Sequence, residues 1–263
     1  MAITSTDQLL AASNQLKSFG KVSMAAKAAG TFQSLWTAAG LPTAGANPAS
    51  PAMVIPTSAT TGALPFVNPV TGRLSYISKI SSAQQTVGTL ILYDRIAHSS
   101  GLNGTLTTAQ AVNGAALTRH TTGEDVELFL EVYTATGATA STVTISYTNS
   151  AGVAGRTTPA VAMQVTPAAG QMLPIPLQSG DTGIRSVQSV TLSASTATAG
   201  NFGITLVKRI AEIPITVAGT GVVLDPFALG FPTIENNACL SFMVVTATTS
   251  TGFITGTINI AQG

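Results

Sequence analysis

The chain has 263 residues, of which 8% are charged and 45% hydrophobic, and its formal net charge is +1. Soluble domains carry about 25% charged residues, so Thr, Ser, Gly, Ala, Asn and Gln must cover most of this surface. The near-neutral charge, without any concentration of Lys and Arg, excludes direct binding to nucleic acid through a basic face.

Membrane spans, a secretory signal and cysteine-based sites are not expected. Thr, Ser or Gly interrupts every apolar stretch before it reaches the roughly 18 residues of a membrane span, so we expect no membrane partner. The N-terminus carries Asp7 and lacks the basic and apolar segments that are typical of a secretory signal. Cys239 is the only cysteine, which excludes an intramolecular disulfide and a thiolate metal cluster. Its simplest interpretation is a small buried apolar side chain.

Residues 1–40 predict an arm of three short helices. Ser5 and Gln8 can form a capping box at the start of the first helix, and Gly20 supplies a stop. A second piece, SMAAKAA, runs into Gly30, and a third follows it. Each piece is too short to be stable alone in water, so its apolar stripe must pack on its own domain or on another protein. The stripes of the first and third pieces contain Leu9, Ala12, Leu16, Phe19, Phe32, Leu35, Trp36 and Ala39.

Residues 41–75 predict an extended arm that is rich in Pro, Gly and Ala. Repeated prolines exclude a continuous helix or a central strand and favour a polyproline-like path. Two interpretations are open, a flexible linker or an ordered arm laid over a neighbouring subunit. Apolar residues favour the ordered arm, because a pure spacer would not need them. These residues are Met53, Val54, Ile55, Leu64, Phe66 and Val67.

Residues 76–263 predict a β domain. Apolar and polar residues alternate there with a period of two, turn residues separate the alternating segments, and no helical pattern lies between them. The whole chain is therefore expected to be mainly β, an antiparallel β-sandwich or jelly roll preceded by the arm of short helices and extended chain. The alternating segments are 127–132, 142–148, 190–195, 202–206, 240–244 and 254–260.

Both histidines lie in stretches that also hold acids and hydroxyls, LYDRIAHSSG and TRHTTGED. If the strands that flank them run antiparallel, His98 and His120 lie at the same end of the sandwich, joined by a long loop of the kind that makes functional contacts or is disordered. Asp94, His98 and Ser99 or Ser100 also supply the residue types of nucleophilic catalysis. A hydrolase that uses Asp94, His98 and His120 is therefore a remote alternative, because the chain lacks a G-x-S-x-G elbow.

Motifs for a phosphate, a dinucleotide or a metal are incomplete. Gly20-Lys21 lacks the earlier glycine of a phosphate-binding loop, and Gly219-Thr220-Gly221 lacks the third glycine of a dinucleotide fingerprint. The two histidines do not have the spacing of a zinc-binding helix. We therefore expect no cofactor, no metal site and no enzymatic activity.

The phrases GRTTPA, LPIPLQ and SGDTGIRSVQSVTLSAS stand out within roughly residues 40–215. Together with the stretches around both histidines, they resemble a group of virion structural proteins of tailed bacteriophages. The resemblance implies membership of a phage particle and assigns no functional residue. A decoration or cement protein on the capsid is a further inference from it.

The leading hypothesis is a structural virion protein, assembled in the host cytoplasm, that bridges capsomers and stabilises the head. Its expected partners are the major capsid protein and further copies of itself. A charge-poor surface and an apolar arm suit a protein that is buried on several sides in an assembly. A neck, tail or fibre component with a binding β-sandwich is the alternative. The residues expected to bind partners are Leu9, Leu16, Phe19, Phe32, Leu35, Trp36, Val54, Ile55, Phe66, His98 and His120.

Overall fold

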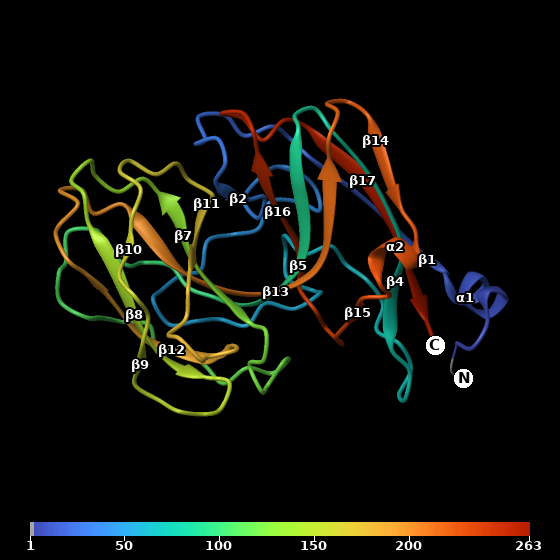
Figure 1. Ribbon diagram of the computed structural model, residues 1–263, viewed down its shortest axis with the longest axis horizontal. Helices are drawn as coiled ribbons and strands as arrows, with labels where there is room; N and C mark the ends of the chain where they lie inside the picture. Colours follow the sequence, from blue (N-terminus) through green and yellow to red (C-terminus); the bar gives the residue numbers. More distant parts are fainter. Residues whose placement is uncertain (1–2) are drawn as a thin grey trace.

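The computed structural model of the chain describes residues 3–263, which form seventeen strands and two short helices. The strands make three groups, a closed barrel in the middle and a sheet on either side of it (Figure 1). Every strand pair within the described residues is antiparallel. The predicted mainly β, antiparallel architecture of packed sheets is therefore confirmed.

The barrel brings together strands from all parts of the chain. In order around the barrel, they are β11 (Gln171–Ile175), β2 (Phe32–Ser34), β16 (Leu240–Thr246), β5 (Gly88–His98), β13 (Asn201–Ile215) and β7 (Glu127–Thr134). The long strand β13 pairs with β5 on one side and with β7 on the other, so it connects the two halves of the molecule.

A six-stranded sheet that contains the first and last strands, here called the terminal sheet, covers one side of the barrel. Its strands are β14 (Gly221–Leu224), β4 (Ser75–Gln84), β17 (Ile254–Gln262), β1 (Gln15–Lys21), β3 (Gly40–Leu41) and β15 (Thr233–Ile234). The helix α2 (Pro226–Leu229) follows β14, and α1 (Thr6–Ala12) lies outside the edge of this sheet (Figure 1). No helix in residues 3–263 is long and apolar enough to cross a membrane.

A five-stranded sheet, here called the distal sheet, covers the other side of the barrel. Its strands are β10 (Val161–Ala162), β8 (Thr142–Asn149), β12 (Ile184–Leu192), β6 (Gln110–Ala111) and β9 (Arg156–Thr157). In β8, buried Val143, Ile145 and Tyr147 alternate with more exposed threonines and a serine, which is the pattern of a sheet with one face on the core.

Strand alternation divides the apolar core into layers. On β5, Leu90 and Leu92 join the cluster between the barrel and the terminal sheet, whereas Ile91 and Tyr93 belong to the cluster inside the barrel. In the cluster between the barrel and the terminal sheet, Phe19 of β1 packs on Phe242 of β16 with ring centroids 4.5 Å apart. A third cluster lies between the barrel and the distal sheet. The barrel thus has apolar side chains on both its inner and outer faces.

The strands β5 and β7 run parallel to each other, so the condition under which both histidines were expected at the same end of the sandwich is not met. Thr205 of β13 pairs with His98 of β5 on one side and with Phe129 of β7 on the other. Because both strands are antiparallel to β13, they share one direction. The chain between them, residues 99–126, is a crossover that adds β6 to the distal sheet and bridges back to β13 through Leu102.

Only the first of the three predicted helices forms. Ser5 caps α1, and its hydroxyl accepts a hydrogen bond from the Gln8 N–H as predicted. Leu16 and Phe19 lie on β1 instead, where pairing with β17 satisfies main-chain groups and alternation buries Phe19. Residues 23–29 form no helix, and Phe32 begins β2. Tertiary pairing therefore outweighs the helical spacing of short apolar stripes.

The segment after residue 41 does not leave the body. Residues 42–74 contain no helix and only a single bridge, between Val54 and His98. Leu64 and Phe66 are buried in the cluster under the terminal sheet. Since residues 15–66 supply strands and core side chains to the same body as residues 76–263, the predicted limits at 40 and 75 do not separate an arm from a domain.

Candidate functional site

Several residues predicted to bind partners lie inside the chain's own core: Leu9, Phe19, Leu35, Trp36, Phe66 and His98. Of the two alternatives for the apolar stripes, the structure therefore shows packing on the own domain. These side chains have almost no surface to offer a partner, because their neighbours already cover them. Leu16 and Val54 are exposed, and Phe32, Ile55 and His120 are partly buried. For these five residues, partner binding stays a prediction.

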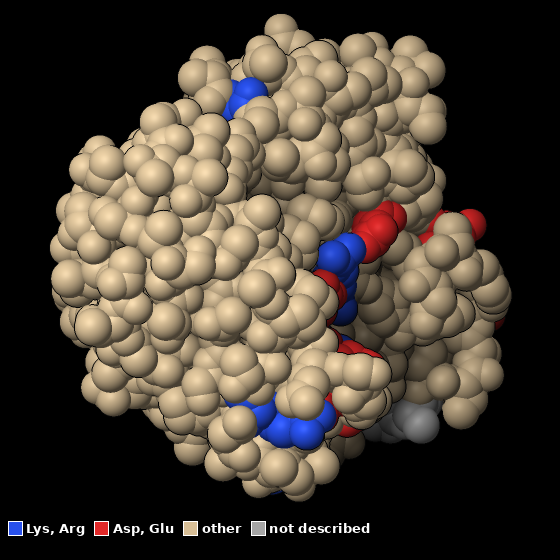
Figure 2. Space-filling view, turned by 60° about the vertical axis from the view of Figure 1, so that its left-hand side comes forward, with Lys and Arg blue, Asp and Glu red and all other residues tan. Residues whose placement is uncertain are grey.

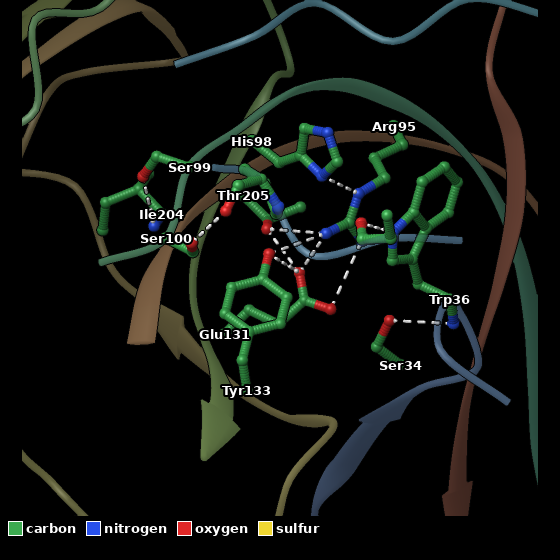
Figure 3. Close-up of polar contacts among 12 residues, drawn as sticks. Ser34, Trp36, Arg95, His98, Ser99, Ser100, Glu131, Tyr133, Ile204 and Thr205 are labelled. Carbon is green, nitrogen blue, oxygen red and sulfur yellow. Dashed lines mark hydrogen bonds and ion pairs between the residues drawn. The ribbon is translucent and has the colours of Figure 1, made fainter. Parts of the chain in front are cut away.

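An ion pair lies fully buried inside the barrel (Figure 3). Two guanidinium nitrogens of Arg95, on β5, donate to the carboxylate of Glu131, on β7. The hydroxyls of Tyr133 and Thr205 donate to Glu131 Oε2 over 3.2 Å and 2.5 Å. The carboxylate is therefore satisfied without water, which is the condition for burying a charge at tolerable cost.

The surroundings of this pair keep Arg95 charged and His98 neutral. Burial, the largest single effect, acts to lower the pKa of Arg95, but Glu131, Tyr133 and Tyr93 together outweigh it and raise the pKa above its ordinary value. Arg95 Nε donates to His98 Nδ1 over 2.8 Å. Burial and the neighbouring guanidinium lower the pKa of His98 to about 2. Trp36 closes the cluster, with its ring centroid 4.8 Å from the guanidinium carbon and 5.4 Å from the imidazole centroid.

A second ion pair lies beside it, where Asp94 points to the opposite face of β5. Arg119 donates to both Asp94 oxygens over 2.8 Å, and the Cys239 N–H donates over 2.8 Å. His120 Nε2 lies 3.6 Å from Asp94 Oδ2. Burial acts to raise the pKa of Asp94, but the nearby His120 and Arg119 lower it below its ordinary value. Arg119 thus links the crossover segment, residues 99–126, to Asp94 on β5, and the Cys239 N–H links Asp94 to the chain before β16.

The Asp94–His98 pairing that the hydrolase hypothesis requires does not form. Asp94 is paired with Arg119, and His98 receives its hydrogen bond from Arg95, so the acid does not orient the imidazole. The Ser99 hydroxyl accepts a hydrogen bond from a backbone N–H of β13, and the Ser100 hydroxyl donates to a backbone carbonyl (Figure 3). Among the described residues, neither of these serine hydroxyls is therefore paired with His98.

A groove of about 760 Å³ lies between the start of β7 and residues 174–182. At one end, Asp181 accepts hydrogen bonds from Tyr147, Asn149 and Arg156. These bonds, that from Arg156 above all, lower the pKa of Asp181 to about 2. The carboxylate is thus committed to its own chain. Within the part of the chain that the structure describes, no group of three His, Cys, Asp or Glu side chains could hold a metal ion.

Charged side chains are sparse on the surface, and several of them pair with each other. Figure 2 shows one face on which Lys, Arg, Asp and Glu occupy a few small areas and opposite charges lie close together. Lys208 lies 2.8 Å from Asp125, and Arg209 contacts both Glu127 and Glu212. These four side chains and Glu212 are therefore paired within the chain's own surface.

Several exposed apolar side chains lie near one end of the terminal sheet and are here called the apolar end. Gln15 of β1 bonds the backbone of Val67, and the ring of Phe227 packs on that of Phe231. Leu74 and Phe231 line one hollow together with Leu9 of α1. Phe227 is 76% exposed. Exposed apolar side chains that lie close together are typical of interaction sites. The apolar end consists of Leu10, Leu16, Val67, Val70, Leu74, Phe227 and Phe231.

The sequence prediction missed most of the apolar end, although it included Leu16 and counted Val67 among the apolar residues of the arm. A sequence signal exists for Phe227 and Phe231, because Asp225 is a typical N-cap residue. It marks the start of the short helix α2, in or next to which both rings lie. Val70 and Leu74 carry none, since isolated apolar residues in a loop are common on protein surfaces. Only the folded chain shows that Leu74 lies beside Leu9 of α1.

These features define a β protein with buried ion pairs and with exposed apolar side chains near one end of the terminal sheet. The sequence matches no protein-family model and no curated protein. Among solved structures, the chain is similar to VP2 of an infectious bursal disease virus subviral particle, with a TM-score of 0.24 and 11% identity over 94% of this chain and 80% of that chain. It is also similar to the VP1 pentamer of human polyomavirus 6, with a TM-score of 0.18 and 12% identity over 99% and 96% of the two chains. Likeness at this level establishes neither a common fold nor a common function.

Proposed function

We propose that the chain is a structural subunit of a virus particle, a decoration protein that attaches to the capsid of a tailed bacteriophage and bridges capsomers. Its partners in this proposal are the major capsid protein and further copies of itself. The apolar end is the observation that carries the proposal. A free monomer would leave these side chains in water, whereas an assembly would bury them.

The charge-poor surface supports the same proposal. Interfaces within stable assemblies are depleted in Lys, Glu and Asp, because each buried charge must lose its hydration. Ser and Thr provide hydrogen bonds at a lower desolvation cost than charged groups. A chain with 8% charged residues therefore suits contacts with several neighbours at once.

The arrangement of the buried polar groups also fits a structural subunit. Arg95 and Glu131 join β5 to β7, and Asp94 and Arg119 join β5 to the crossover segment. Each ion pair links segments that are distant in the sequence, so the pairs act as ties within the body. A subunit that transmits load between capsomers needs such ties.

Charge substitution at the apolar end tests the proposal. In Val67→Asp and Val70→Asp, both at positions 65% exposed, the new carboxylate can stay hydrated in the free protein but would lose water in an interface. We expect each variant to fold and to lose occupancy on phage particles, measured by quantitative mass spectrometry of purified virions. Val153→Asp, at a 52% exposed position in the turn after β8, is the matched control and should keep full occupancy. Unchanged occupancy of the apolar-end variants would refute the proposal.

Copy number separates the capsid from the alternative site of a neck, tail or fibre. A decoration protein follows the capsid lattice and is present in many copies, whereas a tail component is present in few. We expect a number of copies per virion that matches the capsomers. A low number would move the protein to the tail and leave its structural role in place.

A further inference from the structure

Residues 45–62 form a surface loop whose two ends meet, here called the lid loop. An added Cβ on Gly62 would lie 2.6 Å from Gly45 Cα and 3.0 Å from Trp36 Cη2, so both ends of the loop lie at the indole of Trp36. Three prolines interrupt the loop, which contains no helix and no strand beyond a single bridge. Compact loops of this kind, with their ends close together, frequently have a function.

The lid loop is fastened to the body at Trp36 and at the end of β5. The Gly45 N–H donates to the Trp36 carbonyl, and the indole Nε1–H donates to the Ala46 carbonyl, each over 2.8 Å. The backbones of Val54 and His98 exchange two hydrogen bonds of 2.9 Å and 3.0 Å. Further bonds join Ser100 to Pro48 and Ser50, and Ser58 to Asn237. The loop is thus held at separate points and not by a continuous ladder.

At His98, the lid loop takes the place of a neighbouring strand. On one side of β5, the pairing with β16 reaches Asp94, and the Arg95 N–H donates to the Cys239 carbonyl just before β16. Further along the same side, the backbone neighbour of His98 is Val54 of the lid loop. On the other side, β13 stays paired with His98. The last residue of β5 is therefore held by the barrel on one side and by the lid loop on the other.

The contacts of the His98 imidazole favour its neutral form. Its Nδ1 accepts from Arg95 Nε over 2.8 Å, and its ring lies edge-on to that of Trp36 (Figure 3). A proton on Nδ1 would face the guanidinium N–H, donor against donor, and would place a second positive charge beside Arg95. The lid loop contains no Asp or Glu, so it offers no carboxylate that could compensate this charge.

The other titratable groups around this cluster do not supply a new counter-charge in mild acid. The Glu131 carboxylate is already bonded to Arg95. The pKa of Asp94 lies below its ordinary value of about 3.9, so its ion pair with Arg119 persists at about pH 4.5. Burial raises the pKa of the Cys239 thiol to about 12, so the thiol stays neutral. The complete set is Arg95 and Tyr93 on β5, Glu131 and Tyr133 on β7, Cys239 before β16, and Asp94, Arg119 and His120 on the opposite face of β5.

We propose that the lid loop is an acid-operated lid, which opens when His98 takes up a proton while the barrel strands stay paired. Displacement of the lid loop frees one side of His98, so the imidazolium can reach water. It also withdraws Met53 from the cluster between the barrel and the distal sheet, and it uncovers the indole of Trp36. The acid form therefore presents apolar surface that the neutral form buries.

Amide hydrogen exchange at two pH values tests this inference, after correction for the pH dependence of the intrinsic exchange rate. The pKa of His98 is about 2 with the lid closed and returns to about 6.5 once the ring is exposed. The opening equilibrium should therefore rise on the order of 100-fold between pH 7.5 and pH 4.5. We expect the protection of the Val54 and Ser58 amides to fall by this factor, while the amides of β13 keep theirs. Acrylamide quenching of the Trp36 fluorescence should increase over the same range.

His98→Asn is the variant that separates protonation from other effects of acid. Its amide oxygen can accept from Arg95 and takes up no proton in this range, so the lid loop should stay closed at pH 4.5. His120→Asn is the matched control, because it removes the other histidine, and the left-handed backbone at this position, with φ 49°, suits Asn. This control should open as the wild type does. If His98→Asn does not fold at pH 7.5, judged by near-ultraviolet circular dichroism, His98→Gln replaces it.

Three results would overturn the inference. The first is unchanged protection of the lid loop between the two pH values. The second is an equal loss of protection in β13, which would mean global unfolding. The third is the same loss in His98→Asn as in the wild type. The wild-type measurement decides by itself if neither His98 variant folds.

This inference concerns the free chain and goes beyond attachment to a capsid. The exchange and quenching experiments use purified protein without particles, and the lid loop contains no residue of the apolar end. A lid loop that stays closed in acid would leave the decoration role in place. Unchanged occupancy of the apolar-end variants on particles would leave the acid-operated lid in place.

Discussion

Replacing Glu131 by Gln should strongly destabilise the fold, because it leaves the Arg95 guanidinium inside the barrel without a counter-charge. Glu131 Oε2 accepts from Arg95, Tyr133 and Thr205, whereas Oε1 faces only Arg95 Nη1 at 3.4 Å. A Gln amide must place its NH₂ group at one of these oxygens, so a donor will face a donor. Both side chains are at most 1% exposed, so water cannot replace the lost charge.

The expected loss in the free energy of unfolding is about 3–5 kcal/mol, the typical cost of breaking a buried pair by removing one partner. This is a large share of a domain stability of about 5–15 kcal/mol. Adding Arg95→Met to Glu131→Gln should recover at least half of the loss, because the uncompensated charge is removed and the Gln carbonyl can still accept from Tyr133 and Thr205. Full recovery is not expected, since Arg95 also stacks on Trp36.

Urea unfolding followed by the fluorescence of Trp36, the only tryptophan, measures both variants. Glu212→Gln is the matched control. Its carboxylate pairs with Arg209 at a site 51% exposed, where an ion pair contributes about 0–1 kcal/mol. Two results would refute the interpretation of the barrel interior as a desolvated ion-pair site. One is a free energy of unfolding of Glu131→Gln within about 1 kcal/mol of the wild-type value, and the other is a double variant that is no more stable than the single variant.

Three further predictions concern other parts of the molecule. The pKa of His98 is about 2 in the folded chain and about 6.5 in the unfolded chain. The stability that the neutral imidazole contributes is therefore complete above pH 6.5, and the free energy of unfolding falls by about 1.4 kcal/mol for each pH unit below that value. His98→Asn keeps an acceptor for Arg95 and should flatten the stability between pH 6.5 and 4.5 in urea unfolding; an unchanged slope would contradict the assignment. Asp94→Asn should free the crossover segment, seen as faster amide exchange over residues 99–126, and unchanged exchange would show that Arg119 is held by other contacts. Gly45→Ala places a Cβ 2.2 Å from Trp36 Cε2, so it should destabilise the fold and shift the Trp36 emission, whereas Gly221→Ala, with open space around it, should do neither.

Much of the fold follows from local patterns. The alternating segments predicted around 127–132, 142–148 and 202–206 correspond to β7, β8 and β13. These strands bury one face, and burial of one face is what a period of two records. The capped helix after Ser5 was likewise predictable, because its cap lies within four residues of sequence.

The errors arose where a local pattern had two solutions. The apolar spacing of Leu16 and Phe19 fits a helix, but a neighbour for a strand was available in β17, at the other end of the chain. The parallel course of β5 and β7 depends on β13, a strand that follows both of them in the sequence. A pattern within a short window carries no information about such distant pairing.

The sequence by itself determined the β class, the charge-poor surface and the absence of a disulfide within the chain, because these follow from composition and from alternation between neighbours. Only the tertiary structure decided what the few charged groups do. Arg95 and Glu131 are 36 residues apart, and they meet because both flank β13 and point into the barrel. Asp94, next to Arg95, points the other way and holds Arg119 instead of serving His98, since adjacent side chains on a strand take opposite faces.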